Sequence, residues 1–124
     1  MQSVSSNAVA VAVGWQFIKS EVGSVDIPII FNNYREILII ATPWINENAY
    51  NTSLIIPTHF LSNYNIDTIN SYVMGYGGRL NTSTPYGGRV GVDIYSTLNK
   101  LKLTYSVYDN SDRTSVTRLT VYAR

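Results

Sequence analysis

Short apolar runs with a period of two recur along most of the chain, separated by clusters of glycine, proline, asparagine and aspartate. Val90, Val92 and Ile94, for example, fall on one side of a single run. Because side chains alternate across a β-strand, this rhythm is typical of strands with one buried face. It predicts an all-β fold, a single jelly-roll-like antiparallel β-sandwich of about eight strands.

Three runs indicate more about their strands. Residues 36–41 are apolar after the first residue, which predicts a central strand covered on both faces. Residues 54–56 end at Pro57, and proline cannot donate to a β-ladder, so this strand is expected to lie at an edge or to stop there. In the first run, Trp15 and Phe17 share one side, as in a half-buried strand.

The last two runs predict a hairpin that closes the fold. One side of its first strand carries Leu101, Leu103, Tyr105 and Val107. Residues 109–112 are expected to turn the chain into a partner strand at residues 115–122, because aspartate accepts local backbone hydrogen bonds in turns.

The tetrapeptide Tyr-Gly-Gly-Arg occurs twice, at residues 76–79 and 86–89. Paired glycines permit the positive φ angles of tight turns, so the repeat is expected to mark turns of a β-meander. A phosphate-binding loop would set its glycines between a strand and a helix with a lysine following, and the sequence offers neither.

The chain is nearly neutral and of single-domain length, since its 124 residues include nine basic and eight acidic side chains. It lacks the basic run that would release counterions from a nucleic acid, so none is expected as a partner. The apolar runs are too short for membrane insertion, and no cysteine is present. We expect no metal and no cofactor.

Residues that carry catalysis are sparse. His59 is the only histidine, so a second one is missing for a metal set or a catalytic triad, and a structural or surface role is expected. No two carboxylates share a motif that assigns acid and base roles. The sequence therefore predicts no catalytic residues. If folding did pair carboxylates for glycan cleavage, Glu47, Asp67 and Asp93 are the candidates.

Tyrosine and tryptophan are the most informative binding candidates, because a flat apolar face with a polar edge stacks on sugar rings and anchors interfaces. They flank the repeat and also occur in an asparagine-rich segment. The predicted ligand-binding set is Trp44, Asn48, Tyr50, Tyr76, Arg79, Tyr86 and Arg89. The alternative for each aromatic is a place in the β core, and for each arginine the protection of a strand edge.

Residues 3–14, SVSSNAVAVAVG, form an uncharged lead-in of small side chains. Serine or asparagine as an N-cap, followed by alanine, allows a helix on which Val4, Ala8 and Val11 share one side. The alternating valines that end at Val13 equally allow a strand. A helix of this length is not stable alone in water, so the segment needs partners.

Four segments together carry a resemblance to a known family. They are residues 3–10 (SVSSNAVA), residues 34–39 (YREILI), the Tyr76-Gly77 pair and residues 119–124 (LTVYAR). They resemble C-terminal domains of phage and prophage tail-fibre, head-fibre and related virion proteins. In that family a repetitive shaft ends in an SSNAVA-type segment followed by a compact β-sandwich, and the likeness covers almost the whole chain.

The resemblance implies a shaft-end and oligomerisation segment at residues 1–13 and a β-sandwich head at residues 14–124. Such fibres are commonly homotrimers, which implies a helical seam with Val4, Ala8, Val11 and Trp15 at the contacts. A place on the virion, assembled in the host cytoplasm and exposed outside, and a host cell-surface polysaccharide as partner are implied too. The alternatives are a purely structural trimerisation or folding cap and a polysaccharide depolymerase.

Overall fold

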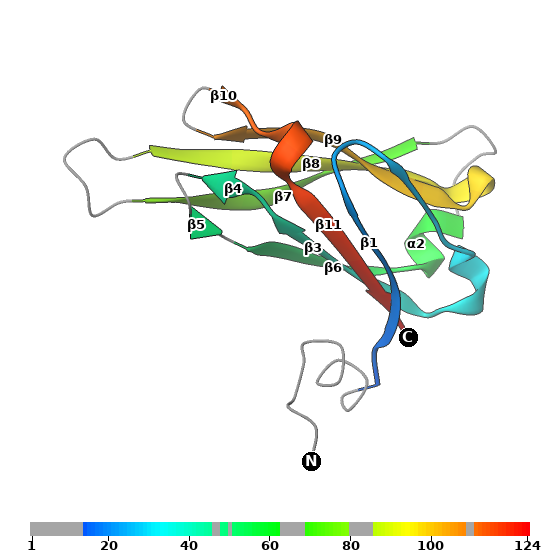
Figure 1. The fold of residues 1–124 in the computed structure, drawn as a ribbon. Helices are drawn as coiled ribbons and strands as arrows, with labels where there is room; N and C mark the ends of the chain where they lie inside the picture. Colours follow the sequence, from blue (N-terminus) through cyan, green and yellow to red (C-terminus); the bar gives the residue numbers. More distant parts are fainter. Residues whose placement is uncertain (1–13, 46–47, 50, 63–68, 80–85, 109–110) are drawn as a thin grey trace, which may run out of the picture.

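A computed structural model describes residues 14–45, 48–49, 51–62, 69–79, 86–108 and 111–124. Within these residues the chain folds into two antiparallel β-sheets that pack face to face (Figure 1). The predicted all-β sandwich is therefore confirmed. The expected N-terminal helical segment lies outside the described residues.

The first sheet has four strands, in the order β1 (Gln16–Val22), β11 (Arg118–Ala123), β3 (Glu36–Thr42) and β6 (Thr52–Pro57). β3 lies between two partners and β6 lies at the edge, as the apolar run and Pro57 predicted. Side chains of β3 alternate between buried and half-buried positions.

The second sheet is a meander with two additions. β7 (Ile69–Arg79), β8 (Tyr86–Tyr95) and β9 (Lys100–Tyr108) pair in succession, while β2 (Asp26–Pro28) and β10 (Ser111–Asp112) both pair with β9. A separate small hairpin consists of β4 (Trp44–Ile45) and β5 (Asn48–Ala49). The short helices are η1 (Phe31–Asn33), α2 (His59–Ser62), η2 (Ser96–Leu98) and η3 (Thr114–Val116).

The main core lies between the two sheets. Ile37 and Ile39 of β3 pack in one cluster with Val90, Val92 and Ile94 of β8, and all five side chains are fully buried. Burial of each contributes about 1.5–3 kcal/mol relative to an exposed side chain. The alternation predicted for β8 is confirmed.

Two register shifts overturn the faces expected for other strands. Between β8 and β9 the register shifts at Gly91 and Val92, so Ser106 is fully buried while Val107 is 38% exposed. In β1 a shift between Phe17 and Lys19 leaves Phe17 41% exposed. An extra residue in one strand reverses which side chains face the core, and the sequence pattern alone does not locate it.

The predicted closing hairpin is wrong. β11 pairs with β1 and β3 in the first sheet, whereas β10 takes up the pairing with β9 in the second. Asp112 does act in the intervening turn, because its carboxylate accepts a hydrogen bond from the Thr114 amide at 2.9 Å. The pKa of Asp112 is lowered, chiefly by a hydrogen bond with the Thr114 side chain and also by the one from the Thr114 amide, because both stabilise the charged carboxylate.

A pair of buried hydroxyl groups stands where the chain crosses between the sheets. Ser106 and Thr117 are fully buried, and their side-chain oxygens lie 2.9 Å apart. Thr117 also donates to the carbonyl oxygen of Arg113 at 2.6 Å. Because buried polar groups are costly without partners, these bonds hold the chain in place between β10 and β11, where it leaves the second sheet for the first.

Replacement of the Thr117 hydroxyl tests whether its hydrogen bonds stabilise the fold. Thr117→Val keeps the shape of the side chain but removes the partner of the buried Ser106 hydroxyl and one of the two donors to the Arg113 carbonyl oxygen, which keeps the Val116 amide. The free energy of unfolding is therefore expected to fall by about 1–3 kcal/mol. Urea unfolding measures this change in the free energy of unfolding. The matched control Thr97→Val, at an exposed position of η2, is expected to change stability by less than about 0.5 kcal/mol. Equal effects of the two substitutions would contradict this account.

Candidate functional site

The two copies of Tyr-Gly-Gly-Arg lie opposite each other in neighbouring strands. Tyr76 is the register partner of Arg89, and Arg79 is the partner of Tyr86. The paired glycines lie within the ladder of β7 and β8, so the prediction that they form tight turns is wrong, whereas the meander is confirmed. In antiparallel alignment the repeat brings each tyrosine opposite an arginine.

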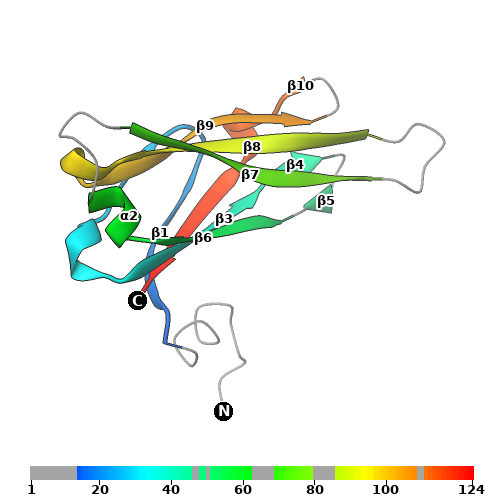
Figure 2. The same ribbon diagram turned by 180° about the vertical axis from the view of Figure 1, so that it is seen from behind.

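A second group of predicted ligand residues lies on the small hairpin. Trp44 is in β4 and Asn48 is in β5, whereas Tyr50 lies outside the described residues. Figures 1 and 2 show this hairpin at the same end of the sandwich as the ends of β7 and β8 that carry the repeat. The fold thus gathers the backbone of most of the predicted set at one end, opposite η1 and α2.

Arg89, the last residue of the second copy of the repeat, belongs to a structured platform with residues of β8 and β9. Its guanidinium carbon lies 5.4 Å from the centroid of the Tyr105 ring, in a cation–π contact. The ring itself lies over Gly91, where a Cβ atom would meet it at 2.2 Å. The absence of a side chain at Gly91 therefore allows the ring to lie against the sheet. The sequence pattern, which put Tyr105 in the core, missed this role.

The side chain of Trp15 is buried by contacts within its own chain. It is 7% exposed, packs with Tyr122, and lies 4.2 Å from the guanidinium carbon of Arg124. The other residues predicted to mediate oligomerisation, Val4, Ala8 and Val11, lie outside the described residues.

An apolar row crosses the outer face of the first sheet. Register pairing aligns one residue from each strand, and the row is Phe17, Tyr122, Leu38 and Ile55. The rings of Phe17 and Tyr122 meet edge to face at 5.7 Å, and Leu38 and Ile40 pack against Trp15 and Tyr122. Ile55 is 52% exposed. Below, we call this set, with Ile40 and Trp15, the outer apolar row.

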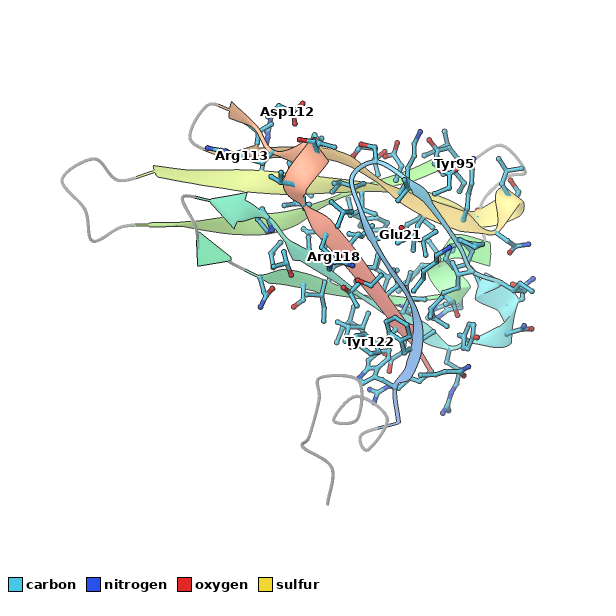
Figure 3. The ribbon with its side chains drawn as sticks, viewed as in Figure 1. Glu21, Tyr95, Asp112, Arg113, Arg118 and Tyr122 are labelled. Carbon is cyan, nitrogen blue, oxygen red and sulfur yellow. The ribbon has the colours of Figure 1, made fainter. Side chains whose placement is uncertain are left out.

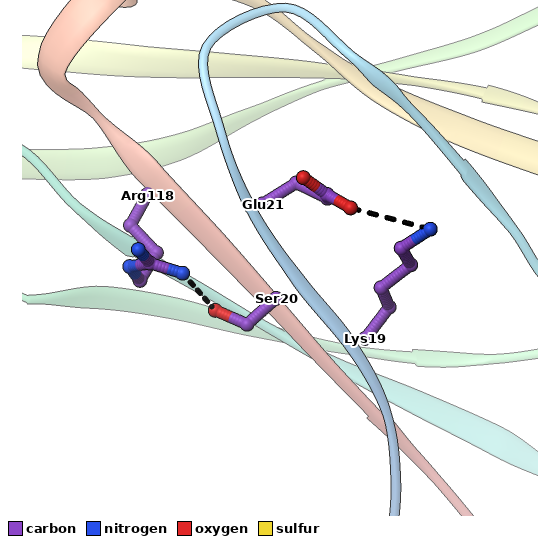
Figure 4. Close-up of polar contacts among 4 residues, drawn as sticks. All are labelled: Lys19, Ser20, Glu21 and Arg118. Atoms are coloured by element: carbon purple, nitrogen blue, oxygen red, sulfur yellow. Dashed lines mark hydrogen bonds and ion pairs between the residues drawn. The ribbon is translucent and has the colours of Figure 1, made fainter.

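The same sheet becomes polar toward the start of β11. Figure 3 shows Tyr122 and Arg118 toward opposite ends of this strand. Arg118 donates to the hydroxyl of Ser20 at 3.0 Å (Figure 4), and the hydroxyl oxygens of Ser20 and Thr120 lie 2.9 Å apart. The ion pair of Lys19 with Glu21, at 3.2 Å, belongs to the other side of β1, because these residues pair with the buried Val121 and Leu119. The outer apolar row is thus confined to one half of the sheet.

A hollow at the opposite end of the sandwich from the repeat is lined by Asn32, Tyr34, Arg35, Thr58 and His59. Arg35 also borders a second hollow, lined by Gly14, Glu36 and Arg124. Sequence reasoning assigned no binding role to these residues, because η1, α2 and the end of β11 are brought together only by the fold. One sequence signal did point to this place. Tyr34 and Arg35 are adjacent and lie in residues 34–39, one of the segments that resemble the virion-protein family.

Of the three carboxylates considered for glycan cleavage, the structure describes Asp93. Asp93 accepts a hydrogen bond from the Ser71 hydroxyl at 2.6 Å, while Glu47 and Asp67 lie outside the described residues. Among described side chains, no group of three or more acidic, histidine or cysteine residues is placed to hold a metal ion.

Comparisons with protein-family models, curated proteins and solved structures find no match for this chain. Within the described residues, no helix has the length and apolar character needed to cross a membrane.

The contact between Tyr105 and Gly91 gives a double-mutant test. Gly91→Ala is expected to lower the free energy of unfolding by about 1–3 kcal/mol, because the added carbon displaces the ring. In a Tyr105→Ala background this cost should vanish, since nothing is left to displace. Urea unfolding of the four proteins measures the difference, and an equal cost in both backgrounds would contradict the platform.

Proposed function

We propose that this chain is the non-enzymatic tip module of a virion fibre, which associates with identical copies and binds a host cell-surface glycan. The observation that carries the binding role is the platform of Arg89, Tyr105 and Gly91, which includes the last residue of the paired repeat.

The platform has the chemistry that sugar binding uses. A tyrosine ring held against the sheet offers a stacking face, and a neighbouring guanidinium donates hydrogen bonds to ring substituents. Arg89 is exposed and Tyr105 is half-buried, so both are open to a ligand. Tyr86 belongs to β8, like Arg89, and Tyr76 and Arg79 belong to the neighbouring strand β7. The small hairpin with Trp44 and Asn48 is at the same end.

Binding is tested with arrays of host cell-wall polysaccharides. We expect Tyr86→Ala, Trp44→Ala and Tyr105→Ala each to weaken glycan binding by about tenfold or more, as for aromatic anchors at interfaces. The matched control is Tyr95→Ala, at the other end of β8. Binding by all three variants at the level of the parent would refute this site.

The outer apolar row supports association with identical copies. Residues 36–41 have the composition of a strand covered on both faces, yet one face of β3 is covered by the core and the other only by Trp15, Tyr122 and their neighbours. The lead-in joins the sandwich at Gly14, next to Trp15 in this row. A bundle of lead-ins around an axis would therefore bring these faces together, and low charge favours such contacts.

Association is tested by sedimentation. Ile55→Asp places a charge in the outer apolar row and is expected to shift the protein from a trimer to a monomer, because the charge would be desolvated at the contact. Val73→Asp is the matched control, because Val73 is 55% exposed in the other sheet and should leave the trimer intact. Removal of residues 1–13 then shows whether the lead-in or the sandwich supplies most of the association. A parent protein that sediments only as a monomer at high concentration would refute the proposal.

A purely structural cap is the second candidate, and the outer apolar row favours it as well. The glycan-binding tip and the structural cap both predict association in sedimentation, but only the glycan-binding tip predicts binding on the polysaccharide array. A trimer that binds no glycan of its host would support the cap alone.

A further inference from the structure

We propose that the hollow around Arg35 binds the anionic substituent of an acidic sugar, at the end of the sandwich opposite the repeat. This site goes beyond the proposed function, because it depends neither on the outer apolar row nor on the platform at Arg89.

The charge balance of the two hollows singles out Arg35. Glu36 and Arg124 neutralise each other in an ion pair, and Arg124 also covers the ring of Trp15. Arg35 is exposed, and its guanidinium forms no hydrogen bond or ion pair with the residues that the structure describes. A guanidinium with all its donors available matches the two oxygens of a carboxylate, or those of a phosphate.

The backbone around Arg35 is held from both sides. The amides of Arg35 and Glu36 donate to the main-chain oxygen of Arg124 at 2.7 and 2.9 Å. The carbonyl of Arg35 accepts from the Thr58 amide at 2.8 Å, and the Thr58 hydroxyl donates to the carbonyl of Tyr34. The start of the side chain is therefore fixed before a ligand arrives, which reduces the entropy lost on binding.

The lining fits a hydroxylated ring better than a bare ion. The hollow next to His59 has a volume of about 360 Å³, within the roughly 300–1,000 Å³ of small-molecule sites. Asn32 offers an exposed amide for hydroxyl groups, and His59 stacks on Phe60 with ring centroids 4.3 Å apart. Because Arg35 borders both hollows, a chain of acidic sugars has room on either side of it.

Glucuronic acid and glucose form a matched pair of probes, because they differ only at C6, a carboxylate in place of a hydroxymethyl group. We expect glucuronate, titrated into the isotope-labelled protein, to shift the amide resonances of Arg35, Thr58 and His59, and glucose to bind at least tenfold more weakly. Glucose 6-phosphate is the third arm. Binding of this probe in place of glucuronate would assign the anion to a phosphate and would retain the site.

Arg35→Gln removes the charge and is expected to weaken glucuronate binding about tenfold or more. Arg35→Lys should recover part of it, since a lysine keeps the charge without the fork of donors. Arg118→Gln, at an exposed arginine on the first sheet, is the control and should bind like the parent. The rest of the amide spectrum reports whether each variant is folded.

Equal binding of glucuronate and glucose, or unchanged glucuronate binding by a folded Arg35→Gln protein, would overturn this proposal. The shifts of the Arg35, Thr58 and His59 amides report the Arg35 site, whereas the polysaccharide array with Tyr86→Ala reports the platform. Failure of the platform at Arg89 and failure of the Arg35 site are thus separate results.

Discussion

The pairing of β11 with β1 and β3 is the interaction on which most surface features of this molecule depend. It brings the last strand of the chain between the first strand and the central one, so that Arg124 lies beside Trp15 and Glu36. The outer apolar row needs Tyr122 from this strand, and the hollow at Arg35 needs the main-chain oxygen of Arg124. Buried bonds between Ser106 and Thr117 hold the chain where it crosses to reach that place.

The two ends of the sandwich carry different chemistry because different elements close them. At one end the long strands β7 and β8 carry the repeated tyrosines and arginines, next to the hairpin of β4 and β5. At the other, Arg35 lies beside residues of η1 and α2, and backbone hydrogen bonds join it to Arg124, after β11, and to Thr58, before α2. A tip module with both ends functional would contact a branched or extended polysaccharide at separate points, which raises avidity without a larger single site.

The two outer faces of the sandwich differ as well. The first sheet exposes Phe17 and Ile55 in the outer apolar row. The second sheet also exposes Ile69 and Val73, but these alternate on β7 with Ser71, which bonds to Asp93. On the same sheet Lys100 and Lys102 lie over the ring of Tyr95. Copies that meet through the first sheet would leave the second sheet and both ends open to ligands. The proposals for association and binding are therefore compatible in one assembly.

Sequence alone determined the fold class, the central position of residues 36–41, the edge position at Pro57 and the buried face of β8. These follow from local hydrophobic period and backbone chemistry, which require no knowledge of distant residues. Tertiary structure decided the crossing of β11, the register shifts that expose Phe17 and bury Ser106, and the position of Tyr105 over Gly91. It also made Arg35 a candidate, since the residues around it are far apart in the chain. The physical reason is that pairing partners and bulges are selected by packing between sheets, and a single strand carries no record of which neighbour it will meet.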